Sequence, residues 1–213
     1  MLVNILTIFP EYFSSVFNVS ILKRAQDKNK VQIKIVDIRD FAQDKHKRVD
    51  DRPFGGGPGM VMKIEPIDLA LNYLGLKKGQ DKSRIILTSA KGQLWTQKKA
   101  QKISNIEQLA IICGHYEGVD ERVAENLVDE EVRIGDYVIT GGESAATVIV
   151  DSIVRLIPGV LGNEESSEQE SHSTIGYLAA PTYTRPREYK TWKVPEVLLK
   201  GDHKEIESFK KRV

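Results

Sequence analysis

The sequence predicts an α/β protein with a mostly parallel sheet and helices on both faces. Short apolar segments typical of buried strands alternate along the chain with segments of helical periodicity, the pattern of parallel strands joined by helical crossovers. The 213 residues, 40% hydrophobic and 29% charged, suffice for one large domain or two small ones. The single cysteine excludes an internal disulfide framework and a multi-cysteine zinc site.

The expected strands and helices follow from apolar runs and from periodicity. Residues 108–113 form an apolar run, and residues 31–38 alternate between apolar and polar as a half-buried strand does. Pro158 and Gly159 end the last helix of this region. Strands are expected at residues 3–9, 31–38, 84–88, 108–113 and 130–134. Helical periodicity is expected at residues 12–22, where a break within the segment is allowed for. Further helices are expected at residues 66–77, 96–104, 121–127, 144–156 and 205–213.

The sequence contains no sign of a membrane or export segment. No apolar run reaches the roughly 20 residues that a membrane-spanning helix needs. The first ten residues lack the basic lead-in of a signal peptide and predict a buried strand instead. We therefore expect a soluble, cytoplasmic protein that does not bind a membrane.

Charge is segregated along the chain, although the net charge is only +1. Residues 77–102 contain eight basic side chains and one acidic one, whereas residues 117–143 contain nine acidic and two basic. Residues 183–213 contain nine basic and five acidic side chains. Separated fields of opposite sign suit one anionic partner and one face that avoids it, although solvated helix faces explain any single stretch better.

A change of composition predicts a boundary between two domains. Residues 162–173 contain four glutamates and no basic residue, which is typical of a linker. The segment that follows is small, basic and helical at its end. The expected division is a first domain at residues 1–161, a flexible linker at 162–175 and a short C-terminal region at 176–213.

Three loops after expected strands are candidates for a binding site, because ligands of open parallel sheets lie at the carboxyl ends of the strands. They are residues 88–92, 114–118 and 134–142, and the last two contain five of the sixteen glycines. Glycine permits positive φ and close approach of the backbone, which recognition of a nucleoside by peptide groups requires. Tight turns explain any single glycine, but three such loops together favour a pocket.

Several familiar sites are excluded. The chain has no phosphate-binding P-loop motif, and no dinucleotide-binding fingerprint follows its first strand. The glycine-rich segment at residues 49–60 is either a phosphate-approaching loop or a flexible lid. Cys113 ends an apolar strand and is expected to behave as a small buried hydrophobe. The four histidines lack the spacing of metal ligands, so no protein-held metal is expected.

Several long motifs identify a family. They are Val49-Asp-Asp-Arg-Pro-Phe-Gly-Gly-Gly-Pro-Gly-Met60, Cys113-Gly-His-Tyr-Glu-Gly-Val-Asp-Glu-Arg122, Ile134-Gly-Asp-Tyr-Val-Ile-Thr-Gly-Gly-Glu143, Ile157-Pro-Gly-Val-Leu-Gly162, Tyr183-Thr-Arg-Pro186 and Val194-Pro-Glu-Val-Leu-Leu-Lys-Gly-Asp-His203. Together they closely resemble the bacterial tRNA (guanine-N1)-methyltransferase family, and the similarity runs from Met1 to the end of the chain.

The resemblance implies a fold, a reaction and an assembly. The fold is of the SPOUT class, in which the sheet domain is tied in a deep trefoil knot that holds S-adenosylmethionine, a rare exception to unknotted topology. The reaction transfers a methyl group from this donor to N1 of guanosine 37 in tRNA. The resemblance also implies a homodimer whose active site lies at the interface, and magnesium assistance without a dedicated protein site.

The resemblance also assigns residues of the site. Glu170 aligns with the linker aspartate that acts as the base in the family, Arg155 with the arginine that stabilises charge on guanine O6, and Glu117 holds the guanine edge. The cofactor-binding residues implied are Leu87, Gly114, Tyr116, Gly118, Ile134, Gly135, Asp136, Tyr137, Val138, Ile139, Gly141 and Gly142.

Two departures from the family keep alternatives open. Glu170 is one methylene longer than aspartate, and a misplacement of about 1 Å can cost about 10²-fold in rate. The family's helical C-terminal domain is shortened here, which predicts weaker tRNA binding. The alternatives are a degenerate protein that binds tRNA or S-adenosylmethionine with little or no turnover, and a related enzyme that acts on ribosomal RNA.

Overall fold

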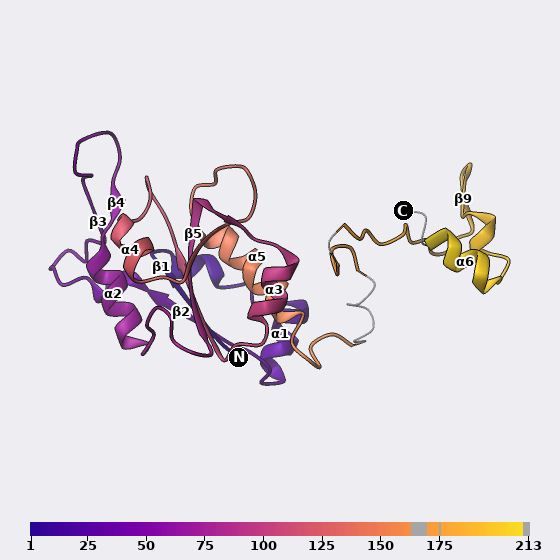
Figure 1. Cartoon of the computed structure of the whole chain (residues 1–213), viewed down its shortest axis with the longest axis horizontal. Coiled ribbons are helices and arrows are strands. Elements are labelled where there is room, and N and C mark those ends of the chain that lie inside the picture. The colour runs from indigo at the N-terminus through magenta and orange to yellow at the C-terminus, as the bar shows by residue number, and fades with distance from the viewer. Residues whose placement is uncertain (163–169, 175, 211–213) are drawn as a thin grey trace. The chain divides into compact units, whose positions relative to one another are not determined.

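The computed structural model describes residues 1–162, 170–174 and 176–210 (Figure 1). The chain divides into two compact units, Met1–Gly162 and Asn163–Val213. The expected division into a domain at 1–161, a linker at 162–175 and a C-terminal region at 176–213 stays a prediction. Most of the expected linker lies outside the described residues. Among the residues described, no helix is long and apolar enough to cross a membrane.

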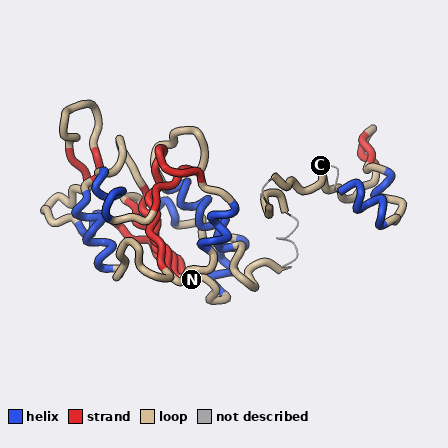
Figure 2. The backbone as a smooth tube through the Cα atoms, in the orientation of Figure 1, coloured by secondary structure: helices blue, strands red, loops and turns tan. Residues whose placement is uncertain are grey.

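The first unit is built on a five-stranded sheet in the order β2-β1-β6-β5-β7. Its strands are among the red segments of Figure 2. All neighbouring strands are parallel, which confirms the predicted sheet type. Strands β1 and β6 pair from Leu2 opposite Gln108 to Leu6 opposite Ile112. The strands are β1 (Leu2–Thr7), β2 (Gln32–Asp37), β5 (Ser83–Leu94), β6 (Gln108–Cys113) and β7 (Glu130–Arg133).

Helices cover both faces of this sheet, as the strand–helix alternation predicts (Figure 1). Alternate residues of β6 point to opposite sides, so Ile111 packs in one hydrophobic cluster and Ile112 in the other. The first cluster includes residues of α1 (Ser20–Asp27), α3 (Gln97–Ile103) and α5 (Glu143–Val154). The second cluster includes residues of α2 (Ile64–Tyr73) and α4 (Glu121–Asn126).

Two predicted helices differ from the observed ones. The helix expected at 12–22 is broken into a short 3₁₀ helix, η1 (Pro10–Phe13), and α1, which begins at Ser20 with φ +51°. The helix expected to reach residue 77 ends at Tyr73, because Gly75 has φ +68° and turns the chain out of the helix. The expected helices at 96–104, 121–127 and 144–156 match α3, α4 and α5 to within one or two residues at either end.

The prediction that residues 88–92 form a loop is wrong, because β5 continues through them to Leu94. The pairing with β7 shifts register between Thr88 and Gln93, so the strand bends rather than ends. Gly92 lies so close to β7 that a Cβ atom would be 2.4 Å from the Val132 nitrogen. Glycine here serves close strand packing rather than a turn.

The polar segment at residues 39–62 contains three short elements of secondary structure. It begins with the 3₁₀ helix η2 (Ile38–Phe41) and continues into a hairpin of β3 (Asp50–Asp51) and β4 (Val61–Met62). Backbone bonds link this hairpin to the loop after β6, with Met62 N donating to Gly118 O at 2.9 Å. The hairpin therefore lies beside the strand ends where a ligand is expected.

The second unit consists of short elements. They are a hairpin of β8 (Glu188–Tyr189) and β9 (Trp192–Lys193), the 3₁₀ helix η4 (Glu196–Leu198) and α6 (His203–Lys210). The helix expected at 205–213 corresponds to α6, and its last three residues lie outside the described residues. None of the described residues of this unit is buried.

Candidate active site

A cavity of about 450 Å³ lies at the carboxyl ends of β5, β6 and β7. It is lined by residues of three segments, 87–91, 114–121 and 131–142, together with Ala145 at the start of α5. Every predicted cofactor-binding residue lines this cavity except Asp136, and Glu117 lines it as well. The Asp136 carboxylate instead accepts a hydrogen bond from Arg133 Nε at 2.8 Å, and its side chain is largely exposed.

The floor of the cavity is a hydrogen-bonded arrangement of backbone. The hydroxyl of Thr88 donates to Ile112 O and accepts from Gly114 N, both at 3.1 Å. Gly142 N donates to Gly114 O at 2.8 Å. These bonds join the ends of β5 and β6 to the start of α5, so the three segments form one rigid wall.

The glycines of this wall are required by close packing rather than by unusual φ angles. A Cβ atom on Gly142 would be 1.9 Å from Thr88 Oγ1 and 2.8 Å from the Cα of Cys113. One on Gly114 would be 2.7 Å from Thr88 O. Of the five glycines in the two loops, only Gly118 has a positive φ, at +135°. These glycines line the cavity, and close packing is the main reason for glycine at Gly114, Gly141 and Gly142.

The cavity fits a nucleoside-bearing methyl donor. Its size is within the range of small-molecule sites, roughly 300–1,000 Å³. The wall can pack this closely only with glycine at positions 141 and 142, because Cβ atoms there would overlap neighbouring protein atoms. Apolar side chains such as Leu87 and Ile134 line the same cavity and suit the flat faces of an adenine ring.

A buried acid next to the cavity was not found by sequence reasoning. Glu143, the first residue of α5, is only 4% exposed, and its Oε1 accepts a hydrogen bond of 2.7 Å from the Thr7 hydroxyl. Its Oε2 lies 3.8 Å from Nδ1 of His115, a cavity-lining residue whose Nδ1 is buried without a hydrogen-bond partner. The helix N-terminus favours a negative side chain at this position.

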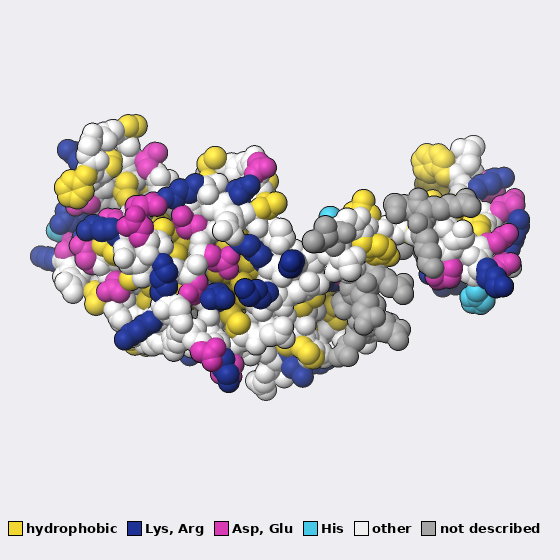
Figure 3. Space-filling model, viewed as in Figure 1, with side chains coloured by type: hydrophobic (Ala, Val, Ile, Leu, Met, Phe, Trp, Pro, Cys, Tyr) yellow, Lys and Arg dark blue, Asp and Glu magenta, His cyan; other side chains and the backbone are white. Residues whose placement is uncertain are grey.

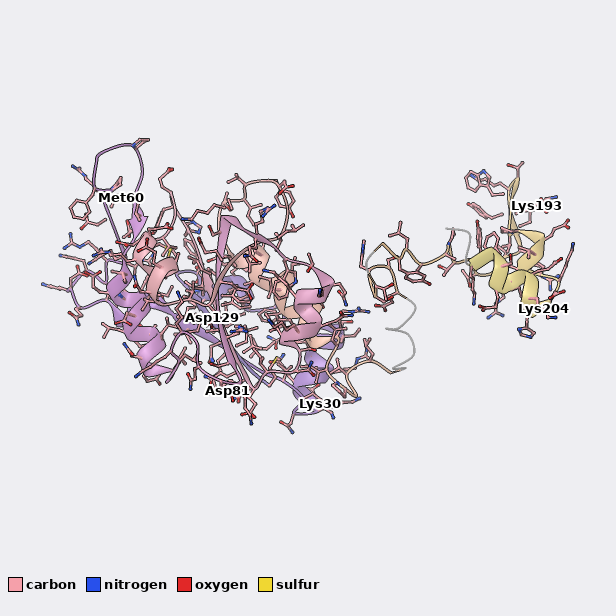
Figure 4. All side chains as sticks on the ribbon, in the orientation of Figure 1. Lys30, Met60, Asp81, Asp129, Lys193 and Lys204 are labelled. Carbon is pink, nitrogen blue, oxygen red and sulfur yellow. The ribbon has the colours of Figure 1, made fainter. Side chains whose placement is uncertain are left out.

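The glycine-rich hairpin loop fixes the position of Glu117. Glu117 N donates to the carbonyl of Met60, labelled in Figure 4, at 3.0 Å. Gly59 has φ +81°, and a Cβ atom there would be 2.4 Å from Glu117 Cγ. A larger residue at position 59 would therefore displace the Glu117 side chain from its observed place. The two roles considered for the loop, a phosphate site and a lid, both stay predictions.

The remaining predicted catalytic residues do not line the cavity. Arg155 follows α5 at its C-terminal end, whereas Gly142 and Ala145 line the cavity at the N-terminal end. A helix of 12 residues is about 18 Å long, so one chain does not bring Arg155 to its own cavity. Glu170 belongs to the second unit, where its carbonyl accepts a bond from Ser173 N at 3.0 Å. Both roles stay predictions.

Thiol and metal chemistry find no support in the described part of the chain. Cys113 is completely buried, and this burial raises the pKa of its thiol well above the ordinary value, which keeps the thiol neutral. Within residues 1–162, 170–174 and 176–210, no group of three or more His, Cys, Asp or Glu side chains is placed to hold a metal ion.

The fold and the cavity define the general class first: an α/β enzyme with a nucleoside-sized, glycine-lined site at the carboxyl ends of parallel strands. Comparison with known proteins then defines the family. The profile described as "tRNA (Guanine-1)-methyltransferase TrmD" matches residues 1–213. The chain belongs to this family, which is of the SPOUT class.

Named relatives agree with this assignment. A tRNA (guanine-N(1)-)-methyltransferase of Anoxybacillus flavithermus is 50% identical over 212 residues, which cover 100% of this chain and 86% of the relative. The protein of the same name in Desulforamulus reducens is 50% identical over 212 residues, covering 100% and 83%. That of Bacillus cereus strain AH820 is 50% identical over 210 residues, covering 99% and 85%. The family resemblance found in the sequence is therefore confirmed.

Proposed function

We propose that the protein transfers a methyl group from S-adenosylmethionine to N1 of guanosine 37 in tRNA. One observation supports this most strongly: a chain 50% identical to tRNA (guanine-N(1)-)-methyltransferases over its whole length has a glycine-lined cavity at its strand ends. We also propose that the reaction takes place in the cytoplasm. The trefoil knot that it implies stays a prediction.

The cavity binds and orients the donor. Backbone atoms of the loops after β6 and β7 would hold the nucleoside, and the Thr88–Gly114–Gly142 bonds keep these loops from moving apart. Glu117, held by Met60 and Gly59, presents a carboxylate at the cavity wall to the amino edge of guanine. The site is thus formed before the substrate arrives, which lowers the entropic barrier.

The transfer needs a base, because guanine N1 is protonated at neutral pH. When bound, S-adenosylmethionine supplies an electrophilic methyl group on a sulfonium. Glu170 would accept the proton of N1 as N1 takes the methyl group from the sulfonium sulfur of the donor, which would be released as the thioether. Arg155 stabilises the negative charge that develops on guanine O6. A positioned base of this kind contributes about 10²–10⁴-fold.

We infer that two copies of the chain complete each active site. The cavity and Arg155 lie at opposite ends of α5, about 18 Å apart in one chain. A second copy can supply Arg155 and Glu170 to the cavity of the first. Magnesium would assist without a dedicated protein site.

Methyl transfer from labelled S-adenosylmethionine tests the function. The substrates are a tRNA transcript with guanosine at positions 36 and 37 and a control transcript with adenosine at 37. We expect transfer to the first transcript only. Transfer to neither, with donor binding intact by calorimetry, would establish the degenerate binder instead. Transfer only to ribosomal RNA in a substrate panel would establish the related enzyme.

A further inference from the structure

The β8–β9 hairpin exposes two large aromatic side chains. Tyr189 is 57% exposed and Trp192 is 66% exposed, and their ring centroids lie 5.8 Å apart at a tilt of 45°. Large aromatic side chains are costly to leave in water. A pair of them on one short hairpin therefore indicates a surface that a partner covers.

A lysine lies over both rings. The Lys190 ammonium is 5.5 Å from the centroid of Tyr189 and 5.6 Å from that of Trp192. Within the described residues it has no carboxylate at ion-pair distance. Hydrophobic and basic side chains also lie side by side at the β9 end of this unit in Figure 3.

The backbone of Lys190 is strained. This residue is the first of the two that connect β8 and β9, and its φ is +56°. Glycine, asparagine or aspartate is usual at such a position, and a lysine there is unfavourable. A strained residue that persists is a sign of function. The strain here coincides with the placement of a cation over two exposed aromatic rings.

We propose that this hairpin is a base-stacking platform for the tRNA substrate. An unpaired base stacks on Trp192 or Tyr189, and the Lys190 ammonium contacts a neighbouring phosphate. Aromatic faces that alternate with basic side chains are the usual surface for unstacked RNA bases. The choice of tRNA as the partner rests on the proposed function, whereas the stacking surface rests on the hairpin alone.

Tryptophan fluorescence provides a direct test in the full-length protein. The chain has two tryptophans, so Trp95→Phe leaves Trp192 as the only reporter. Titration with the guanosine-37 transcript is expected to quench this emission. Trp192→Ala is expected to weaken binding about 5- to 150-fold, from the 1–3 kcal/mol of base–aromatic stacking, and Trp192→Phe much less. Leu199→Ala, which removes another exposed side chain of this unit, is the control and should not change binding.

Lys190→Gly separates a binding role from a structural one. Glycine relieves the strain at φ +56°, so the melting temperature should stay the same or rise. Binding should nevertheless weaken, and the salt dependence of the binding constant should fall by about one counterion. If Lys190 has only a structural role, Lys190→Gly should lower the melting temperature and leave the affinity for tRNA unchanged.

Other outcomes would overturn the proposal. They are unchanged tRNA affinity in Trp192→Ala, the absence of quenching while tRNA binds, or self-association that Trp192→Ala abolishes in sedimentation. The last would make the hairpin a protein interface. Methyl transfer by the unmodified protein is measured on the same transcript. Quenching and Trp192-dependent binding without methyl transfer would refute the proposed activity and leave the stacking surface standing.

Discussion

The two units differ in what holds them together. The first has two hydrophobic clusters, one on each face of a parallel sheet, and all the buried residues of the described chain lie in it. The second unit has short elements and no buried residue among those described. The first can therefore be rigid by itself, which a preformed donor site needs. The second has no such core among its described residues, so less of its order comes from buried apolar packing.

Hydrogen exchange should show the largest difference between the units. We expect amides of β1 and β6 to exchange more than about 10³-fold more slowly than those of the second unit, because core amides open only with global unfolding. Mass spectrometry of peptic peptides measures this. Adding tRNA should slow exchange in the β8–β9 hairpin. Equal protection in both units without tRNA would refute the comparison.

Glu170→Gln should separate chemistry in the second unit from binding in the first. Without a carboxylate to accept the N1 proton, the turnover number should fall about 10²–10⁴-fold. The affinity for S-adenosylmethionine, measured by calorimetry, and the melting temperature should stay unchanged. Glu170→Asp is the matched control and should retain activity. Normal turnover in Glu170→Gln would remove this residue from the mechanism.

Gly142→Ala should affect both stability and donor binding, because its Cβ would overlap Thr88 and the Cys113 backbone. Overpacking of this kind destabilises by about 1–3 kcal/mol. Donor affinity should fall at least about tenfold, since the cavity wall must shift. Gly162→Ala is the control, because nothing lies within 4 Å of its Cβ position. Urea unfolding and calorimetry give both quantities, and equal behaviour of the two variants would contradict the role assigned to Gly142.

Glu143→Ala should destabilise the first unit by about 1–3 kcal/mol, because it leaves the Thr7 hydroxyl without its buried acceptor. Glu143→Gln keeps an oxygen at that position and should lose less. Urea unfolding measures the free energy of unfolding of both variants. The difference between them separates the contribution of the Thr7 hydrogen bond from that of side-chain packing. If Gln is as damaging as Ala, the charge beside His115, rather than the bond to Thr7, is what stabilises this corner.

The smallest effect concerns pH. Burial raises the pKa of Cys113 in the folded state above its ordinary value of 9.0, so the unfolded thiol loses its proton first. The stabilising contribution is complete below about pH 9 and is lost as pH rises, by up to about 1.4 kcal/mol per pH unit. In Cys113→Ala the free energy of unfolding should therefore fall less steeply above about pH 9 than in the unmodified protein. Urea unfolding at a series of pH values measures this. The native thiol should also resist alkylation at pH 8, and rapid alkylation would contradict its burial.

The strands were predictable where burial on both faces left an unbroken apolar run. The run at Gln108–Cys113 predicted β6 with its observed bounds, because each residue packs into one of the two clusters or pairs in the sheet. Prediction failed at Thr88–Gly92, where polar residues and glycine resemble a loop. The reason for Gly92 is its contact with the Val132 backbone, which is distant in the sequence.

The sequence by itself determined the alternation of strands and helices, the family, and the glycines of the cavity. These features are local: apolar periodicity and motif order can be read along the chain. Only the tertiary structure brought Thr7 and Glu143, 136 residues apart, into one hydrogen bond beside His115. A parallel sheet carries the ends of distant strands to a common edge, and no local pattern records which side chains meet there.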